Sequence, residues 1–359
     1  MKILLITDLY PIIEDKTIPN AILDFAVGLK DFGEELCVFR PNFLLNSIIR
    51  KHKIVKNGFF EKQGIKIYNQ NFIFPFFNAK NPFDIDFDLI ISHMPSGHLC
   101  AYEMNKKLNL PHVAIIHQSD FEVLSSFKYL FYFKNALKKA LNCAKIIGAR
   151  NEFLKEKLNA KFLLPSYVLK ENIVSKKEFN NEKLKIVTLS KLIKRKNLDK
   201  VILALSQAGF DFEYDIYGSG REEKKLKKLI KKYNLENKIN LCGQIEHSKI
   251  HQTLDNYDIF ILPSVNETFG ISYLEALSRG LITIGVKNTG IDGVIKNYEN
   301  GFLIEPRADE IKEILTKISK MNSEEKEKIS KNALQNIKDY EKNEIMTKYV
   351  DVIKKILWK

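Results

Sequence analysis

The sequence predicts an α/β protein made of two doubly wound domains, each built on a parallel sheet, that face each other across a cleft. Its 359 residues exceed one ordinary hydrophobic core and suit two domains. Short β-branched runs alternate with amphipathic stretches from end to end, which is typical of parallel α/β units. Residues 166–183 are polar and aperiodic, so we place a linker at 169–182, between domains at 1–168 and 183–340.

The expected strands are short apolar runs separated by helical stretches. They lie at 2–7, 35–40, 65–72, 88–92, 112–117, 145–149 and 161–165 in the first domain, and at 184–190, 212–218, 239–243, 258–264, 281–286 and 301–305 in the second. Amphipathic stretches such as ILDFAVGLKDF and AYEMNKKLN predict helices, and the tail from about 308 to 359 reads as helical. Ligands of open parallel sheets bind at the carboxyl ends of the strands, so we expect a site where the two domains meet.

The composition is that of a soluble globular protein, with 45% hydrophobic and 28% charged residues. No apolar run approaches the roughly 18 residues that span a bilayer. The segment MKILLITDLYP reads as a first core strand, because a signal peptide needs a longer apolar region and a small-residue cleavage site. The four cysteines are far apart, in apolar settings and without a CxxC pair, so we expect reduced core residues of a cytoplasmic protein: Cys37, Cys100, Cys143 and Cys242.

The net charge of +13 raises the question of a nucleic-acid partner. The lysines are mixed with glutamates, as in REEKKLKKLIKKYNLENK, which is typical of a solvated helix face; we therefore expect no nucleic acid. A phosphorylated substrate or an anionic membrane surface is the better use of the charge. Aromatic and basic residues occur together at 59–77 and 127–141, either through core packing or as a lipid-facing patch. The second stretch is the better lipid candidate, because Lys128, Lys134, Lys138 and Lys139 could flank an aromatic face.

The stretch PSVNETFGISYLEALSRG (263–280) carries the strongest chemical signal. A buried strand ends at its start, a loop follows, and Gly270 opens an amphipathic helix. The amides at a helix start favour an anion such as a diphosphate, and glycine allows close backbone approach. Taken singly, Glu267 could be a capping residue and Glu275 a solvated one. Eight residues of helix rise about 12 Å, so the two carboxylates are better placed to hold distinct parts of one elongated ligand.

This pattern, PSxxExFGxxxLEAxxxG, closely resembles the E-x7-E signature of retaining glycosyltransferases of family 4, which have the GT-B fold of two Rossmann-like domains. The resemblance implies that Glu267 lies near the donor sugar and that Glu275 bonds the ribose hydroxyls of the nucleotide. It also implies that the backbone amides of Phe269 and Gly270 approach the sugar and the phosphates.

Further segments of the second half resemble the same family. VTLSKLIKRKNLDKVILAL resembles GRLxxxKGxDxLIxA, which makes Lys196 the diphosphate-binding lysine; Lys191 stands where arginine is usual, and Arg195 could compensate. DIYGSGREEKKL resembles a strand-GxG segment whose turn, here Gly218 and Gly220, lies by the nucleotide base.

VKNTGIDGVIKNYENGFLIEP resembles the family's next loop and makes Asn288, Thr289 and Gly290 candidates for lining the sugar. Gly293 occupies a position where the family has glutamate, so no function is carried onto it.

The first half resembles the family more loosely. HVAIIHQSD is similar to a strand that ends in His-x-x-Asp, which would place His117 in the cleft against the donor sugar. DLIISH is similar to the preceding strand and ends in His93. The family's Gly-Gly pair after the first strand is missing, and DLYPIIEDKTIPN offers only Lys16 and Thr17 near that place. The C-terminal helix at 341–359 would pack back on the first domain, which would be the acceptor side.

Three other motifs do not support a different function. FDIDFD (83–88) has metal-site spacing, but it precedes a strand, where polar residues are ordinary. HSKIH (247–251) has zinc-like spacing without a third ligand, so we read it as a surface helix. TDLYPI lacks the GxGxxG of a nicotinamide site.

The resemblance implies a glycosyltransferase that moves a sugar from a nucleoside-diphosphate-sugar, UDP- or GDP-linked, to an acceptor hydroxyl with retention and without a metal. The acceptor would be a carbohydrate or lipid-linked saccharide in bacterial surface polysaccharide, lipooligosaccharide or glycan assembly. The protein would be cytoplasmic, with a peripheral contact on the inner face of the membrane. The alternatives are a nucleotide-sugar epimerase, a sugar phosphorylase or a non-catalytic binder.

Overall fold

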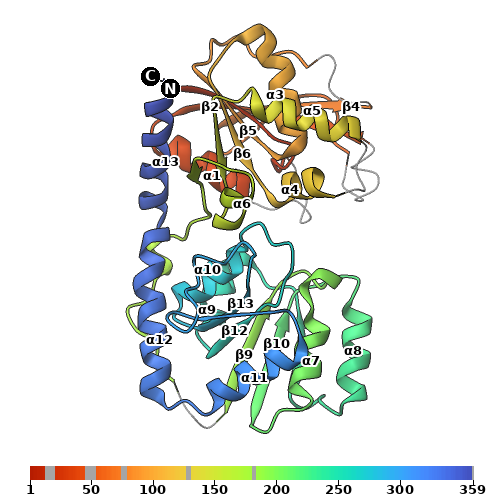
Figure 1. Ribbon diagram of the computed structural model, residues 1–359, viewed down its shortest axis with the longest axis vertical. Helices are drawn as coiled ribbons and strands as arrows, with labels where there is room; N and C mark the ends of the chain where they lie inside the picture. The colour runs from red at the N-terminus through yellow and green to blue at the C-terminus, as the bar shows by residue number, and fades with distance from the viewer. Residues whose placement is uncertain (13–20, 45–53, 74–78, 127–130, 180–182, 358–359) are drawn as a thin grey trace. The chain divides into compact units, whose positions relative to one another are not determined.

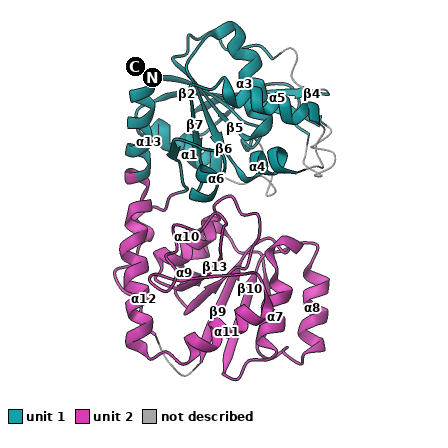
Figure 2. Ribbon diagram, in the orientation of Figure 1, with its two compact units in different colours: residues 1–166, 345–359 teal, residues 167–344 magenta. Residues whose placement is uncertain are grey.

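The computed structural model describes residues 1–12, 21–44, 54–73, 79–126, 131–179 and 183–357. The chain divides into two compact units, one of residues 1–166 with 345–359 and one of residues 167–344 (Figure 2). Both are α/β (Figure 1), which confirms the predicted fold class. None of the helices within the described ranges combines the length and apolar character needed to cross a membrane.

Unit 1 is built on a sheet whose strand order, for the described residues, is β3-β4-β2-β1-β5-β6-β7-β8. The strands are β1 (Lys2–Ile6), β2 (Glu35–Phe43), β3 (Gly58–Lys62), β4 (Ile65–Phe72), β5 (Leu89–His93), β6 (His112–Ile116), β7 (Ile146–Ala149) and β8 (Phe162–Leu163). The helices are α1 (Ala21–Asp31), α3 (Met94–Leu108), α4 (Gln118–Ser125), α5 (Phe131–Asn142) and α6 (Glu152–Lys157). All seven strands predicted for this half are present.

Strand β3 was not predicted, because its residues GFFEK were read only as the start of the aromatic and basic stretch. It pairs antiparallel with β4 at the sheet edge, whereas the other described pairs are parallel. The two strands are joined at Gln63 and Gly64, whose φ angles of 52° and 67° match a tight hairpin turn. Glutamine is not a typical residue for such a turn, so the hairpin has a weak sequence signal.

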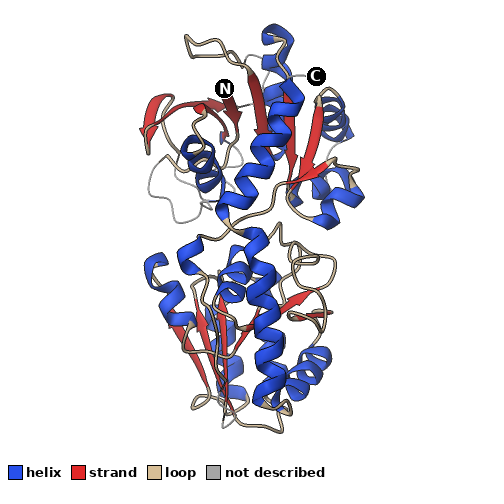
Figure 3. Ribbon diagram, turned by 90° about the vertical axis from the view of Figure 1, so that its left-hand side faces the viewer, coloured by secondary structure: helices blue, strands red, loops and turns tan. Residues whose placement is uncertain are grey.

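Unit 2 has the parallel strand order β11-β10-β9-β12-β13-β14, and helices flank its sheet (Figure 3). Its strands are β9 (Leu184–Leu189), β10 (Phe212–Tyr217), β11 (Ile239–Gly243), β12 (Ile259–Ile261), β13 (Ile282–Val286) and β14 (Phe302–Ile304). Its helices are α7 (Leu198–Leu205), α8 (Glu223–Lys232), α9 (Ile250–Leu254), α10 (Ile271–Ser278), α11 (Ala308–Ser319) and α12 (Ser323–Asn336). Because these strands are parallel and adjacent in the order β10-β9-β12-β13, the loops that follow them lie next to one another at the carboxyl end of the sheet.

Helix α13 (Lys342–Leu357) contributes to unit 1 from Ile345 onward. The ring of Tyr349 packs 5.0 Å from that of Phe25, and Lys145 donates a hydrogen bond of 2.7 Å to the carbonyl of Ile356. Residues 167–179 belong to unit 2, where Phe179 is buried in the core.

Two of the cysteines correct the sequence-based expectation. Cys37 and Cys100 are buried as predicted, but Cys143 and Cys242 are exposed. Cys143 follows α5, and Cys242 lies on β11, which is the last strand of the unit 2 sheet among the described strands and is flanked by one on only one side.

Candidate active site

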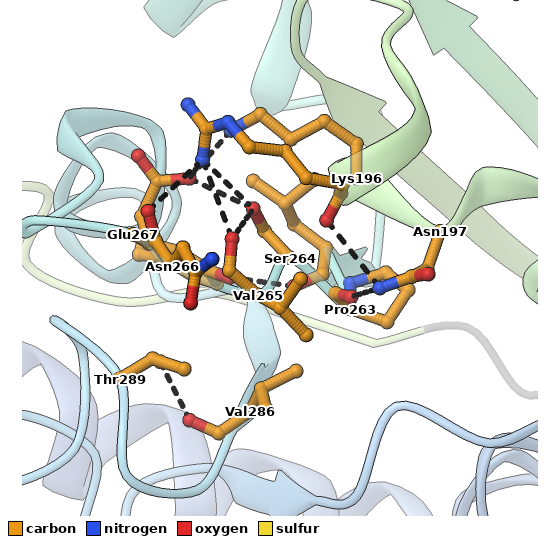
Figure 4. Close-up of polar contacts among 12 residues, drawn as sticks. Lys196, Asn197, Pro263, Ser264, Val265, Asn266, Glu267, Val286 and Thr289 are labelled. Atoms are coloured by element: carbon orange, nitrogen blue, oxygen red, sulfur yellow. Dashed lines mark hydrogen bonds and ion pairs between the residues drawn. The ribbon is translucent and has the colours of Figure 1, made fainter. Parts of the chain in front are cut away.

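The loop after β12 carries Glu267, whose carboxylate is the centre of a compact polar cluster (Figure 4). Its Oε2 accepts hydrogen bonds from Lys196 Nζ at 2.6 Å, Arg195 Nη1 at 3.1 Å and Ser264 Oγ at 2.9 Å. Lys196 is 7% exposed, so one buried ammonium and one exposed guanidinium share this oxygen. Ser264 was not predicted as a site residue.

The two loops that supply this cluster are held together by a side-chain and a backbone hydrogen bond. Lys196 ends a short 3-10 turn after β9, and Asn197 follows it with a left-handed φ of 54°. Asn197 Nδ2 donates 2.8 Å to the carbonyl of Pro263, and Val265 N donates 3.0 Å to that of Arg195. Because β9 and β12 are adjacent strands, residues about seventy positions apart in the sequence meet here.

The charges of this cluster shift one another's pKa values. Burial favours a higher pKa for Glu267, but Lys196 and Arg195, together with the hydrogen bonds from Lys196 and Ser264, outweigh it and lower that pKa. The pKa of Lys196 is also lowered, first by burial and then by Arg195 and Lys191, although Glu267 opposes this. The lowered pKa values of both groups are compatible. The carboxylate of Glu267 has three partners that stabilise its charged form, whereas the ammonium of Lys196 has one carboxylate and two cations near it. We conclude that Glu267 is ionised and that Lys191 lies close enough to act on Lys196.

Gly270 precedes α10 in a left-handed conformation, with φ of 83°. A Cβ there would lie 2.6 Å from the ring of Tyr273, so both conformation and space require glycine. Phe269 is buried, with its ring 6.2 Å from that of Tyr340.

The turn after β13 packs on this loop. A Cβ on Gly290 would lie 2.5 Å from Cα of Phe269, and Gly290 N donates 3.0 Å to the carbonyl of Glu267. The neighbouring Thr289 is buried and donates 2.7 Å to the carbonyl of Val286 (Figure 4), whereas Asn288 is exposed.

Glu275 lies within α10 and is buried. Its Oε1 is 3.5 Å from Nε2 of His247, an exposed side chain that begins a 3-10 turn after β11. His247 was predicted only as part of a surface helix, and the structure places it beside a predicted site residue. Nothing in the sequence spacing signalled this pair.

The turn with Gly218 and Gly220 packs on the loop after β9. A Cβ on Gly218 would lie 1.8 Å from the carbonyl oxygen of Ser190, and Leu192 N donates 2.9 Å to the carbonyl of Ser219. The glycines are therefore needed for backbone contact, and they hold this turn against the segment that carries Lys191.

In unit 1, His117 follows β6 and is buried, and its Nε2 lies 2.9 Å from Nδ1 of His93 at the end of the neighbouring strand β5. Burial lowers the pKa of both imidazoles well below the ordinary value; Arg150 and His98 add to this at each, and His117 does so at His93. Both rings are therefore neutral near pH 7, and one N–H lies between them.

Further buried groups lie near this pair and were not predicted as site residues. Asp120 accepts the backbone N–H of His117 at 2.8 Å, and its other oxygen is 3.4 Å from Nε2 of His98. Ser92 Oγ lies 2.7 Å from both His98 Nδ1 and His112 Nε2. The His-x-x-Asp spacing indicated Asp120. It did not indicate His98, which lies on α3, or His112, which begins β6.

The remaining candidates lie elsewhere. In FDIDFD, Asp88 accepts the backbone N–H of Lys2 at 2.8 Å. In the described ranges, His, Cys, Asp and Glu side chains do not gather in threes at a place that could hold a metal ion. Lys16, Thr17 and Lys128 lie outside the described residues.

Comparison with known proteins places this site in context. Residues 170–336, just under half of the chain, match the family described as Glycosyl transferases group 1. The chain is 31% identical to the GtfA subunit of a UDP-N-acetylglucosamine–peptide N-acetylglucosaminyltransferase from Streptococcus pneumoniae over 132 residues. The aligned region covers 36% of this chain and 26% of that protein. Over 149 residues the chain is 32% identical to the amylovoran biosynthesis glycosyltransferase AmsK from Erwinia amylovora, which is 39% of this chain and 37% of that protein. The chain thus spans about a quarter to a third of these relatives.

Solved structures resemble the whole chain. A sucrose-phosphate synthase from Thermosynechococcus elongatus superposes with a TM-score of 0.79 at 13% identity, covering 99% of this chain and 98% of the other. Anabaena HepE, solved with UDP and glucose, gives 0.72 at 15% identity, covering 99% and 100%. The chain therefore has the predicted GT-B fold, and every residue assigned to donor binding in unit 2 lies inside the match to group 1 glycosyl transferases.

Proposed function

We propose that this protein is a retaining glycosyltransferase of family 4 that moves a sugar from a nucleoside-diphosphate-sugar to an acceptor hydroxyl. The observation that carries the proposal is the cluster of Lys196, Arg195 and Glu267. Glu267 lies in the loop that leads into helix α10, which Gly270 precedes. Buried positive charge near the start of a helix, where the backbone amides point outward, suits a diphosphate. The neighbouring carboxylate suits sugar hydroxyls.

In this reaction the bond between the anomeric carbon and the diphosphate oxygen breaks, and the nucleoside diphosphate leaves with the electron pair. The acceptor hydroxyl oxygen forms the new bond to the anomeric carbon, and its proton passes to the departing diphosphate oxygen. Lys196, with Lys191 and Arg195, compensates the charge that develops on the diphosphate, as do the amides at Phe269 and Gly270. In this proposal they do what a metal ion does in other transferases.

The other predicted residues hold the two ends of the donor. Glu275 accepts hydrogen bonds from the ribose, and the turn of Gly218 and Gly220 lies by the base. Glu267 orients the sugar, and His117 hydrogen-bonds it from unit 1. Asn288, Thr289 and Gly290 form the neighbouring wall, which the contact of Gly290 with the Glu267 loop supports.

For the acceptor we propose a carbohydrate or lipid-linked saccharide of a bacterial surface glycan, in the cytoplasm at the inner face of the membrane. The similarity to AmsK and GtfA, whose names concern amylovoran and peptide glycosylation, supports glycan assembly. Phe131 and Tyr132 are 78% and 65% exposed at the start of α5, and Lys138 and Lys139 are exposed on the same helix. Such a face suits anionic lipid.

The test is incubation with UDP-, GDP- and ADP-sugars, with and without saccharide acceptors, followed by measurement of nucleoside diphosphate release. UDP-sugars come first, because HepE was solved with UDP. We expect acceptor-dependent release from one nucleotide class and a product with the donor's anomeric configuration by NMR. Interconversion of donor sugars without an acceptor would indicate an epimerase, and a lack of turnover with every donor would overturn the proposal.

A further inference from the structure

The carboxylate of Glu267 is the counter-ion of the cations that are proposed to take the diphosphate. Lys196 and Arg195 donate to the same oxygen, at 2.6 and 3.1 Å, and Ser264 donates to it as well. The side chains of Lys196 and Glu267 are only 9% and 13% exposed, so water screens this pair weakly. A buried ammonium depends on such a partner for its charged form.

A diphosphate that binds Lys196 must therefore share this ammonium with a carboxylate. Phosphate oxygens within hydrogen-bond reach of Lys196 Nζ come within a few ångströms of Glu267 Oε2. Like charges this close repel each other strongly where water screens them weakly. The ion pair thus opposes the binding of a bare diphosphate.

Donor and product differ at the phosphate next to this carboxylate. In the donor, that phosphate is esterified to a sugar whose hydroxyls can donate hydrogen bonds to Glu267, replacing part of what it receives from Lys196 and Arg195. The free nucleoside diphosphate has no such hydroxyls, and its terminal phosphate gains negative charge when the sugar departs. The product therefore meets Glu267 only as a repulsive charge.

We infer that Glu267 selects the sugar-carrying donor over the free nucleoside diphosphate and so promotes product release, through its ion pair with Lys196 and Arg195. This role rests on the proposed function for its ligand, but the ion pair itself does not. It is a binding role that is separate from orienting the sugar during transfer.

Calorimetry with inorganic pyrophosphate and UDP tests the inference on the full-length protein. Glu267→Gln keeps the shape and a hydrogen-bond acceptor for Ser264 but removes the charge, so pyrophosphate and UDP should bind about 10-fold tighter or more. Turnover should fall in the same variant. Asp258→Asn is the matched control, because it removes a buried carboxylate of the same unit that precedes β12, whereas Glu267 lies beyond the end of that strand. Pyrophosphate binding should not change.

A double-mutant cycle tests whether the tighter pyrophosphate binding depends on the ion pair with Lys196. In the Lys196→Gln background, Glu267→Gln should strengthen pyrophosphate binding much less than in the parent protein. Should Glu267→Gln fail to fold, Glu267→Ser removes the same charge and is measured instead. Unchanged or weaker pyrophosphate binding after loss of the charge overturns the inference.

The outcomes separate this inference from the proposed function. Donor turnover by the parent protein, with no tightening in the Glu267 variants, leaves the glycosyltransferase proposal standing and removes the counter-ion role. Tightening without turnover of any donor supports the counter-ion role and removes the glycosyltransferase proposal. Absence of pyrophosphate binding in both parent and variants overturns the inference.

Discussion

The contact between Gly290 and the Glu267 loop leads to a quantitative prediction for Gly290→Ala. The added Cβ would lie 2.5 Å from Cα and N of Phe269 and from the carbonyl carbon of Thr268. Ordinary contacts of this kind begin at 3.4 Å, so the two backbone segments must separate by roughly 0.9 Å. Backbone atoms form all three contacts, so a rotamer change cannot relieve them.

The displaced segment carries Glu267 and the amides around Gly270. Overpacking of this kind costs about 1–3 kcal/mol of unfolding free energy, and a misplacement of about 1 Å at a reacting centre costs about 100-fold in rate. We expect a melting temperature lower by about 2–4 °C per kcal/mol and turnover lower by about 100-fold. Thermal melts and nucleoside diphosphate release measure the two effects.

Gly209→Ala is the matched control in the same unit. Its Cβ would meet no heavy atom within 4 Å, and its φ is not in the left-handed region, so stability and turnover should stay close to those of the parent. Parent-like melting and turnover in Gly290→Ala would refute the steric argument. A lowered melting temperature with full turnover would show that the displacement does not reach the groups around Glu267.

Three further predictions follow from the same structure. Lys196→Ala should lower turnover by at least about 100-fold because the diphosphate loses a buried cation, whereas the exposed Lys194→Ala in the same turn should not; equal rates in the two variants would contradict the assigned role. His93→Leu should lower turnover and change the ring ¹⁵N shifts of His117, because the 2.9 Å contact fixes that ring, and His93→Asn should restore part of both; unchanged shifts in His93→Leu would remove this positioning role. Burial lowers the pKa of His112 to about 3, so the unfolded chain binds this proton first as pH falls below 6.5. The contribution of His112 to the unfolding free energy should then drop by about 1.4 kcal/mol per pH unit down to that pKa, in addition to the losses from His93 and His117. Denaturant titrations at pH 6.5 and 4.5 should show this loss, and a slope that is the same in His112→Gln would argue against it.

Much of the fold could be predicted because the strands of a parallel sheet are covered on both faces and read as continuous apolar runs. Strand β1 is an example, since four of its five residues are buried. Strand β3 lacks that signal, because its side chains alternate between half-buried and exposed at an antiparallel edge. The exposure of Cys242 has the same origin, since β11 is also an edge strand.

The candidate site also combines features that a local sequence pattern predicted with contacts that depend on the fold. The spacing of Glu267 and Glu275 and the opening Gly270 are contiguous in the sequence, so a local pattern was enough to propose them. The partners of Glu267 were proposed one by one, but their convergence on one oxygen depends on the adjacency of β9 and β12. The pairing of His247 with Glu275 had no local signal at all.

The sequence by itself determined most of the order of strands and helices, the α/β class and the acidic loop that suggests a nucleotide-sugar. Hydrophobic periodicity and local motifs depend only on near neighbours in the chain. The tertiary structure alone decided that Lys196 and Arg195 both donate to one oxygen of Glu267 and that backbone packs against Gly290 and Gly218. It also decided that the ring of His117 forms a hydrogen bond with that of His93. The physical reason is that ion pairs, close backbone contacts and buried hydrogen bonds join residues on neighbouring strands, and the neighbours of a strand are set by the packing of the whole sheet.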